Sequence, residues 1–283
     1  MTATEPTTTF LWLEITGKCQ LSCSHCYAGS GPDGTHGTMT ADDWKRVITD
    51  GARTGVTMVQ FIGGEPTLHP DLPELIRYAL DEDLSVEVYS NLVHVTGGLW
   101  NMFRLPGVSL ATSFYSDDRE QHRRITGRDT LRQTTASIEQ ATAHGIPLRV
   151  GIIEILDGQR VTEATELLGR IGVQDVSTDR MRAIGRAGDG DATELCGQCG
   201  DGIAAILPDG SVSPCPMSRA TTVGNVLTDG LSTTLGEPMR TAVAALPEPV
   251  GVDACNPPCN PNNCSPFCLP SQLCTPNCRP RNR

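Results

Sequence analysis

Three cysteines close to the N-terminus are the first residues whose types and spacing predict chemistry. Cys19, Cys23 and Cys26 form a C-x-x-x-C-x-x-C pattern directly after a short hydrophobic run. Three thiols this close cannot all pair with one another, and a tetrahedral zinc site would need a fourth ligand, such as His25 or His36. A 4Fe–4S cluster held by three cysteines would instead leave one iron without a protein ligand, and that iron would be open to chemistry.

A second motif, Gly63-Gly64-Glu65-Pro66, follows the next strand-like run. Its two glycines carry no side chains, so a ligand can approach the backbone closely, and the proline restricts the turn. Together with the cysteine spacing, this motif resembles the radical S-adenosylmethionine (radical SAM) superfamily. The zinc alternative accounts for the cysteines but leaves the second motif unexplained.

The resemblance implies a cofactor and a reaction type. It implies that Cys19, Cys23 and Cys26 hold one 4Fe–4S cluster, whose open iron takes the amino and carboxylate groups of S-adenosylmethionine. One-electron reduction by a reductase, or by a flavodoxin or ferredoxin, would release a 5′-deoxyadenosyl radical that removes a hydrogen atom from the substrate. The protein then mainly places the reactants and excludes side reactions.

The resemblance also implies which residues surround S-adenosylmethionine. The positions that match the family's contacts are Tyr27, Gly63, Gly64, Glu65, Ser90 and Asn91. Of these, the glycine segment would bind the methionine amino group with the glutamate close by, and the Ser-Asn pair resembles the ribose and carboxylate contact. A simple loop cap is the alternative for that pair, and plain packing is the alternative for the tyrosine side chain. The family usually carries an aromatic residue just before the third cysteine, where this chain has His25.

The elements that must position these residues alternate between strand and helix up to about residue 184, which is typical of an α/β fold with parallel strands. Strands are expected at 10–15, 56–62, 84–89, 108–114, 147–155 and 173–181. Helices are expected after Thr40, a capping residue with Asp43 three positions on, and at 72–80, 131–143 and 161–168. Six such units match the partial (β/α)6 barrel of radical SAM enzymes. Chemistry in such barrels lies at the carboxyl ends of the strands, where both motifs fall.

Other polar residues near strand ends give weaker indications. Positional candidates for the site are Ser113, Ile153, Glu154, Arg180, Arg182 and Arg186. For the three arginines, simple exposure to solvent is the commoner explanation. No catalytic base is identified from the sequence.

The segment 185–191 breaks the alternation and is expected to be a linker, which divides the chain into a barrel at 1–184 and a second domain at 185–283. Nine of the twelve cysteines lie in this second part, whose end is rich in proline and asparagine. Its apolar content is too low for a core of its own, which favours ordering by bound metal.

Cys199, Gly210 and Cys215 form a C-x10-G-x4-C pattern around an expected hairpin that turns at Asp209-Gly210. The pattern resembles the SPASM domain, an extension of radical SAM enzymes that holds auxiliary 4Fe–4S clusters. One or two such clusters are implied, with ligands among Cys196, Cys199, Cys215, Cys255, Cys259, Cys264, Cys268, Cys274 and Cys278. A zinc ribbon or zinc cluster is the alternative, because the two cysteines at 196 and 199 have zinc-knuckle spacing.

Composition argues against several classes of partner. The chain carries 22 basic and 33 acidic residues, a net charge of −11, and has no basic stripe, so nucleic acid is not expected as a partner. Neither a signal peptide nor an apolar run long enough for a bilayer is present, so we expect a soluble, cytoplasmic protein without a membrane partner. Twelve cysteines without an export signal favour metal or redox chemistry over a disulfide scaffold.

The resemblance also points to a class of substrate, because radical SAM enzymes with SPASM extensions most often modify ribosomally made peptides. We expect oxidative cross-linking through a thioether, carbon–carbon or carbon–oxygen bond, with an auxiliary cluster accepting the second electron. Peptide epimerisation, dehydrogenation of a small alcohol and non-catalytic electron transfer are the alternatives. The barrel begins without the peptide-recognition domain of many relatives, so either a separate recognition protein presents the peptide or the enzyme reads it directly.

Overall fold

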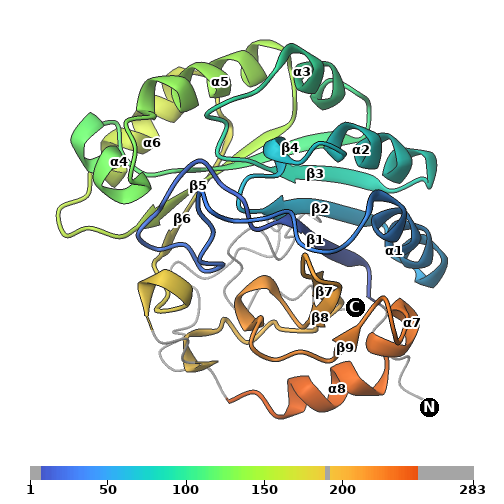
Figure 1. The fold of residues 1–283 in the computed structure, drawn as a ribbon. Helices are drawn as coiled ribbons and strands as arrows, with labels where there is room; N and C mark the ends of the chain where they lie inside the picture. The colour runs from blue at the N-terminus through green and yellow to red at the C-terminus, as the bar shows by residue number, and fades with distance from the viewer. Residues whose placement is uncertain (1–7, 189–191, 248–283) are drawn as a thin grey trace, which may run out of the picture.

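The computed structural model describes residues 8–188 and 192–247. Its strands are β1 Phe10–Thr16, β2 Met58–Gly63, β3 Ser85–Tyr89, β4 Val108–Phe114, β5 Leu148–Glu154, β6 Asp175–Arg180, β7 Ile203–Ile206, β8 Ser211–Ser213 and β9 Gly224–Asn225. All of them belong to one sheet with the order β6-β5-β4-β3-β2-β1-β7-β8-β9. Strands β1 to β6 each pair in parallel with the next along the chain, as Figure 1 shows. The expected α/β fold with parallel strands is therefore confirmed.

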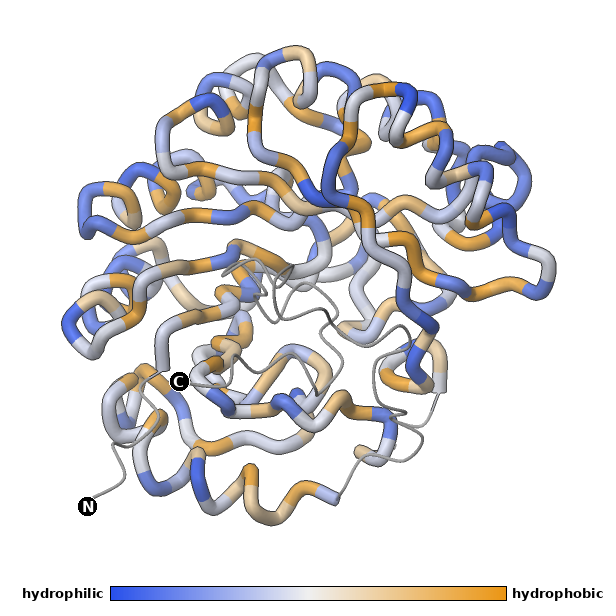
Figure 2. Tube along the Cα trace, turned by 180° about the vertical axis from the view of Figure 1, so that it is seen from behind, coloured by the Kyte–Doolittle hydropathy of each residue, from blue (hydrophilic) through white to orange (hydrophobic). Residues whose placement is uncertain are grey.

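Helices cover the outer face of the parallel strands β1 to β6 (Figure 1). They are α1 Ala41–Thr54, α2 Leu72–Asp81, α3 Gly97–Phe103, α4 Arg119–Thr126, α5 Leu131–Ala143 and α6 Val161–Arg170. Two further helices, α7 Leu231–Thr234 and α8 Glu237–Ala244, lie near β9. Hydrophobic and hydrophilic positions alternate along these helices, as Figure 2 shows, because one side of each packs on the sheet. No helix in the described part of the chain is long and apolar enough to span a membrane.

Apolar layers lie on both faces of β1. Leu11 and Leu13 pack with the outer helices, whereas Phe10 and Trp12 face the interior of the curved sheet. All seven residues of β1 are buried. A parallel strand covered on both faces reads as a continuous hydrophobic run, which is why the sequence identified this strand so directly.

The helix starts and ends follow from local chemistry. Thr40 and Asp43 form a reciprocal capping box at the start of α1, as the sequence predicts, and Gly55 ends this helix in the left-handed conformation. Helix α5 and strand β4 have the predicted bounds. Helix α3 was not expected, because it opens on two glycines, yet the Thr96 hydroxyl caps it by accepting a bond from the Leu99 amide.

Two features of the fold differ from the expectation of six strand–helix units. In the described residues, β6 is followed by a short 3-10 turn, η2 Gly185–Ala187, at the place where the α-helix of the sixth strand–helix unit was expected. In addition, β7 pairs in parallel with β1, and β8 and β9 then follow in antiparallel pairing. The hairpin that the sequence predicts at residues 203–213 is thus present, but it extends the barrel sheet at the β1 edge.

A buried polar network crosses the interior face of the sheet below the strand ends. The guanidinium of Arg149 on β5 forms an ion pair with the Glu87 carboxylate on β3 at 2.5 Å, and both side chains are almost fully buried. The amide nitrogen of Gln60 on β2 donates to the same carboxylate. One acidic side chain therefore joins three strands.

Replacing Glu87 by alanine removes the carboxylate that this network shares. Because loss of one partner of a buried ion pair leaves a desolvated charge behind, we expect Glu87→Ala to lower the free energy of unfolding by about 3–5 kcal/mol. Glu120→Ala is the matched control, because Glu120 forms an exposed pair with Arg123 and should matter little. Denaturant titration of both variants tests this, and equal effects would contradict it.

Candidate active site

The cysteine loop that follows β1 is held by a contact within itself and by contacts to α4 and η2. The backbone amide of Cys19 donates to the Gly31 carbonyl at 3.0 Å, which closes the loop on itself. The amides of Ser22 and Ser24 donate to carbonyls at the carboxyl end of α4. On the opposite side, the amide of Arg186 in η2 donates to the carbonyl of Cys26 at 3.0 Å. Backbone contacts to α4 and η2 therefore hold the loop from two sides.

The three cysteines of this loop line one cavity of about 300 Å³. Burial raises the pKa of Cys19 to about 11 and that of Cys23 to about 12. Thiols in such surroundings become thiolates only when a positive partner such as a metal centre compensates the charge. In the described part of the chain, no three His, Cys, Asp or Glu side chains converge on a single ion.

The Gly63-Gly64 pair lies directly against the start of the cysteine loop. Gly63 has φ +149°, and a Cβ there would lie 2.3 Å from the Thr16 carbonyl oxygen. A Cβ on Gly64 would lie 2.4 Å from the Lys18 carbonyl oxygen. The amide of Gly64 donates to the Thr16 carbonyl at 2.7 Å. The close approach of protein backbone therefore already requires both glycines, and it brings the two motifs together at the same edge of the sheet.

The carboxylate of Glu65 is completely buried and connects the ends of β2 and β3. It accepts bonds from the Thr67 amide at 3.0 Å and the Thr67 hydroxyl at 2.7 Å. It also accepts bonds from the Ser90 hydroxyl and the Asn91 amide, each at 2.7 Å. Burial raises the pKa of Glu65, although these donors act in the opposite direction. Both carboxylate oxygens are thus used to hold neighbouring parts of the protein.

The side chain of Asn91 reaches from β3 to the cysteine loop. Its amide nitrogen donates to Cys19 Sγ at 3.7 Å and to Gln20 Oε1 at 3.3 Å, and its oxygen accepts from Gln20 Nε2 at 3.0 Å. Ser90 and Asn91, which the sequence analysis placed at this strand end, line the same cavity as the cysteines. Five of the six positions of the expected S-adenosylmethionine site therefore line one cavity, and the sixth, Glu65, is fully buried and does not line it.

Arg186 and its neighbour Gly185 have a structural role that the sequence analysis missed. The Arg186 guanidinium donates to the carbonyls of Cys23 and Ser30. Gly185 has φ +65°, and a Cβ there would lie 2.2 Å from the Tyr27 carbonyl oxygen. The expectation that 185–191 is a plain linker is thus wrong for its first residues, and Arg186 is more than a solvent-exposed charge. The only signal in the sequence was a Gly-Arg pair after a strand, which is not specific.

Tyr27 is half-buried on the cavity wall, beside a buried ion pair that the sequence analysis also missed. Arg219 donates to both carboxylate oxygens of Glu14, at 2.9 Å and 3.1 Å. Burial raises the pKa of Glu14, and the charge of Arg219 opposes this. A glutamate within the hydrophobic run of β1 was the signal that could have revealed this pair. The pair ties β1 to the segment that follows β8.

His25 projects from the cysteine loop to the end of β4. Its Nε2 lies 3.2 Å from the phenol oxygen of Tyr115, and the two rings meet edge to face. Burial, together with the charge of Arg186, lowers the pKa of His25 to about 4. Gln159 Nε2 donates to the Tyr115 carbonyl at 2.7 Å and thereby fixes the backbone of the tyrosine.

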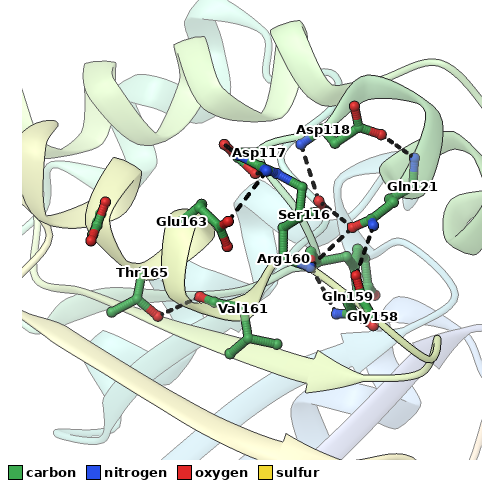
Figure 3. A network of polar contacts seen from close by, with 12 residues as sticks. Ser116, Asp117, Asp118, Gln121, Gly158, Gln159, Arg160, Val161, Glu163 and Thr165 are labelled. Atoms are coloured by element: carbon green, nitrogen blue, oxygen red, sulfur yellow. Dashed lines mark hydrogen bonds and ion pairs between the residues drawn. The ribbon is translucent and has the colours of Figure 1, made fainter.

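A polar network on the loops after β4 and β5 continues this support toward the surface, as Figure 3 shows. Gln121 accepts from the Ser116 hydroxyl at 2.8 Å and from the Arg160 amide at 3.1 Å. The Arg160 guanidinium pairs with Asp117 at 2.8 Å. These contacts join the two loops. Asp117 is therefore occupied by this ion pair and does not line the cavity.

Three cysteines of the second part of the chain line the same cavity. They are Cys196, Cys199 and Cys215. The sulfur atoms of Cys199 and Cys215 are 3.4 Å apart and buried. The Cys199 thiol and the Ser218 hydroxyl and amide favour the thiolate of Cys215 and lower its pKa. The remaining expected ligands, Cys255, Cys259, Cys264, Cys268, Cys274 and Cys278, lie outside the described residues.

The structure places most, but not all, of the weaker positional candidates on the cavity lining. Ser113, Ile153, Arg180 and Arg182 line the cavity, whereas Glu154 does not. Both of these arginines are paired, Arg180 with Glu194 and Arg182 with Asp179, each at 2.7 Å. Their charges are therefore already compensated on the cavity wall.

The crowding at Gly185 gives a test of how the cysteine loop is held. Gly185→Ala places a methyl group against the Tyr27 carbonyl, so we expect η2 to move away and the loop to retain less iron. Gly158→Ala is the matched control, because Gly158 has φ +69° but open space around its Cβ position. Iron content after anaerobic reconstitution and denaturant unfolding measure the difference. The idea is wrong if the two variants behave alike.

Comparisons with known proteins agree with this geometry. The model of the Radical SAM superfamily matches residues 13–181. PqqA peptide cyclase of Bradyrhizobium diazoefficiens is 42% identical over 81 residues, which make up 29% of this chain and 20% of that protein. AdoMet-dependent heme synthase of Methanosarcina barkeri is 27% identical over 181 residues, 63% of this chain and 52% of that protein. The chain thus spans between a fifth and about half of the length of these curated relatives.

Solved structures give a match over more of the chain. Streptococcus suis SuiB bound to S-adenosylmethionine has a TM-score of 0.71 at 14% identity, covering 85% of this chain and 68% of SuiB. SuiB bound to its precursor peptide SuiA gives the same TM-score. At this identity the likeness concerns the fold alone. Because the family match extends over more than half of the sequence and includes both motifs that line the cavity, the chain belongs to the Radical SAM superfamily.

Proposed function

We propose that this chain binds a 4Fe–4S cluster through Cys19, Cys23 and Cys26 and binds S-adenosylmethionine beside it. The observation that carries the proposal is that the three thiols, the Gly63-Gly64 pair and Asn91 line one cavity. When bound, the cluster and S-adenosylmethionine supply a 5′-deoxyadenosyl radical that removes a hydrogen atom from the substrate. The protein's own contribution is to place the substrate and exclude water.

The residues of the expected S-adenosylmethionine site divide into contacts and supports. Both oxygens of Glu65 already accept bonds from protein groups, which favours a positioning role for this residue. The Ser90 hydroxyl donates to Glu65 and is likewise engaged. Asn91, which lies within hydrogen-bonding distance of Cys19 Sγ, and the backbone at Gly63-Gly64 are therefore the better candidates for direct contact. Tyr27 would contribute its backbone and one face of its ring.

We propose that Cys196, Cys199 and Cys215 are among the ligands of one or two auxiliary 4Fe–4S clusters in a SPASM-like domain at 185–283, next to a barrel at 1–184. Their place on the cavity wall, with two of the sulfur atoms 3.4 Å apart, supports this proposal. Cys215 also accepts a bond from the Ser218 amide at 3.3 Å, an interaction that stabilises a thiolate ligand. The other ligands would come from the cysteines after residue 250.

A ribosomally made peptide is the proposed substrate, with oxidative cross-linking as the reaction. Support comes from the relatives, since one is named a peptide cyclase and SuiB has been solved with a precursor peptide. In such a reaction the peptide would lose one hydrogen atom to the 5′-deoxyadenosyl radical and one proton from the atom that forms the new bond, so that the product would be lighter by two hydrogen atoms. An auxiliary cluster, if held by these cysteines, would supply the acceptor for the remaining electron. A flavodoxin, ferredoxin or reductase would supply the initiating electron, and a recognition protein is a further candidate partner.

Substitution of a cluster ligand tests the enzyme proposal. We expect Cys23→Ala to lose most of the iron of the first cluster and to form no 5′-deoxyadenosine from reduced protein and S-adenosylmethionine, since two thiols cannot retain the cluster. Ser24→Ala, an exposed change in the same loop, should keep both properties. Iron, zinc and sulfide analysis and chromatography of the products provide the readout. Unchanged cleavage in Cys23→Ala would refute the proposal, and a lack of cleavage by the unmodified protein would favour an electron carrier.

Mass spectrometry of candidate peptides tests the reaction type. With reduced enzyme we expect a product lighter by two hydrogen atoms, and we expect Cys199→Ser to form 5′-deoxyadenosine but little product, since the second electron has no acceptor. A product whose mass is unchanged in ordinary water but higher by one deuterium-for-hydrogen exchange in deuterated water would mean epimerisation, because one hydrogen atom of the peptide is then replaced from solvent. Zinc in place of additional iron would contradict the auxiliary clusters.

A further inference from the structure

His25 lies inside the cysteine loop, and one of its two ring nitrogens has no partner. Its Nε2 is 3.2 Å from the Tyr115 phenol oxygen. Its Nδ1 is buried and makes no hydrogen bond to any residue in the described part of the chain. The same side chain lines the cavity together with Cys19, Cys23 and Cys26. Buried ring nitrogens are normally satisfied, so this one points to a bonding partner beyond the described residues.

The contact with Tyr115 distinguishes the two tautomers of the His25 ring. The phenol oxygen lies 3.2 Å from Nε2 and can either donate to it or accept from it. When the phenol donates, Nε2 accepts and the ring proton lies on Nδ1. In that tautomer the unpartnered atom is an N–H donor that requires an acceptor.

The proposed cluster would bring sulfur acceptors into the cavity that His25 lines. In the sequence His25 lies between two of the proposed ligands, Cys23 and Cys26, and all three residues line that cavity. We propose that the Nδ1–H of His25 donates a hydrogen bond to a sulfide or thiolate sulfur of the first 4Fe–4S cluster and so raises its reduction potential. This inference rests on the proposed cluster ligands. A hydrogen bond to a cluster sulfur stabilises the extra negative charge of the reduced state.

Redox titration of the reconstituted full-length protein without S-adenosylmethionine tests this role. His25→Phe keeps an aromatic ring but removes the donor, so we expect a more negative midpoint potential. A tenfold fall in the equilibrium constant for reduction corresponds to about 59 mV for a one-electron couple. His25→Asn should restore a value near that of the unmodified protein, because an asparagine amide N–H can occupy the position of Nδ1. His25→Gln places its amide near the position of Nε2 and should not restore the potential.

Two further measurements separate the outcomes. Iron and sulfide content of the unmodified protein reports on the cluster itself, so a failure of the proposed function is visible before any potential is compared. Tyr115→Phe removes the hydroxyl that can donate to Nε2 but keeps the imidazole, so we expect a potential between those of the unmodified protein and His25→Phe. Equal potentials for the unmodified protein and His25→Phe, both with full iron content, would overturn the inference. A difference that appears only after addition of S-adenosylmethionine would also overturn it, because the acceptor would then be the cofactor.

If His25→Phe does not assemble a cluster, the comparison between His25→Asn and His25→Gln decides. A wild-type potential in the asparagine variant and a more negative one in the glutamine variant support the hydrogen bond. Identical potentials in these two variants contradict it.

Discussion

The buried carboxylate of Glu65 is the interaction on which the arrangement of the site depends. Four donors, two from Thr67 and one each from Ser90 and Asn91, surround an acid that has no exposed surface. These bonds fix the end of β2 to the end of β3, and Asn91 then reaches Cys19 and Gln20 in the cysteine loop. A buried acid is tolerated only when it is fully bonded, so the ends of two strands and the loop must form together.

Around this point, the chain controls its chemistry by excluding water. The cysteine loop is fixed by backbone bonds, and the thiols at 19 and 23 are desolvated before any metal arrives. Charges on the cavity wall are compensated in pairs, such as Arg182 with Asp179. Such a site gives little stabilisation to stray ions, and it gains most from a bound group that brings its own positive charge.

The sequence predicted the parts of the fold that depend on local patterns. Buried parallel strands such as β4, and helix α5 with its apolar periodicity, were found at their observed bounds because neighbouring residues determine them. The three-cysteine motif and the Gly-Gly-Glu-Pro motif could be recognised in the sequence because the residues of each motif lie close together in the chain. The residues that were missed act over long distances in sequence. Arg186 contacts Cys23, and Arg219 contacts Glu14, across more than 150 residues in each case. No periodicity or propensity encodes such contacts, and the same holds for the pairing of β7 with β1.

That pairing has a consequence for the order in which the protein is made. Strand β1 is synthesised early, but its second neighbour is not available until residues 203–206 have left the ribosome. Until then one edge of β1 presents unpaired backbone groups, which invite aggregation. Closing so long a stretch of chain is also slow, because the contact is far from local. The nascent chain would therefore benefit from a chaperone that shields this edge until β7 has been synthesised.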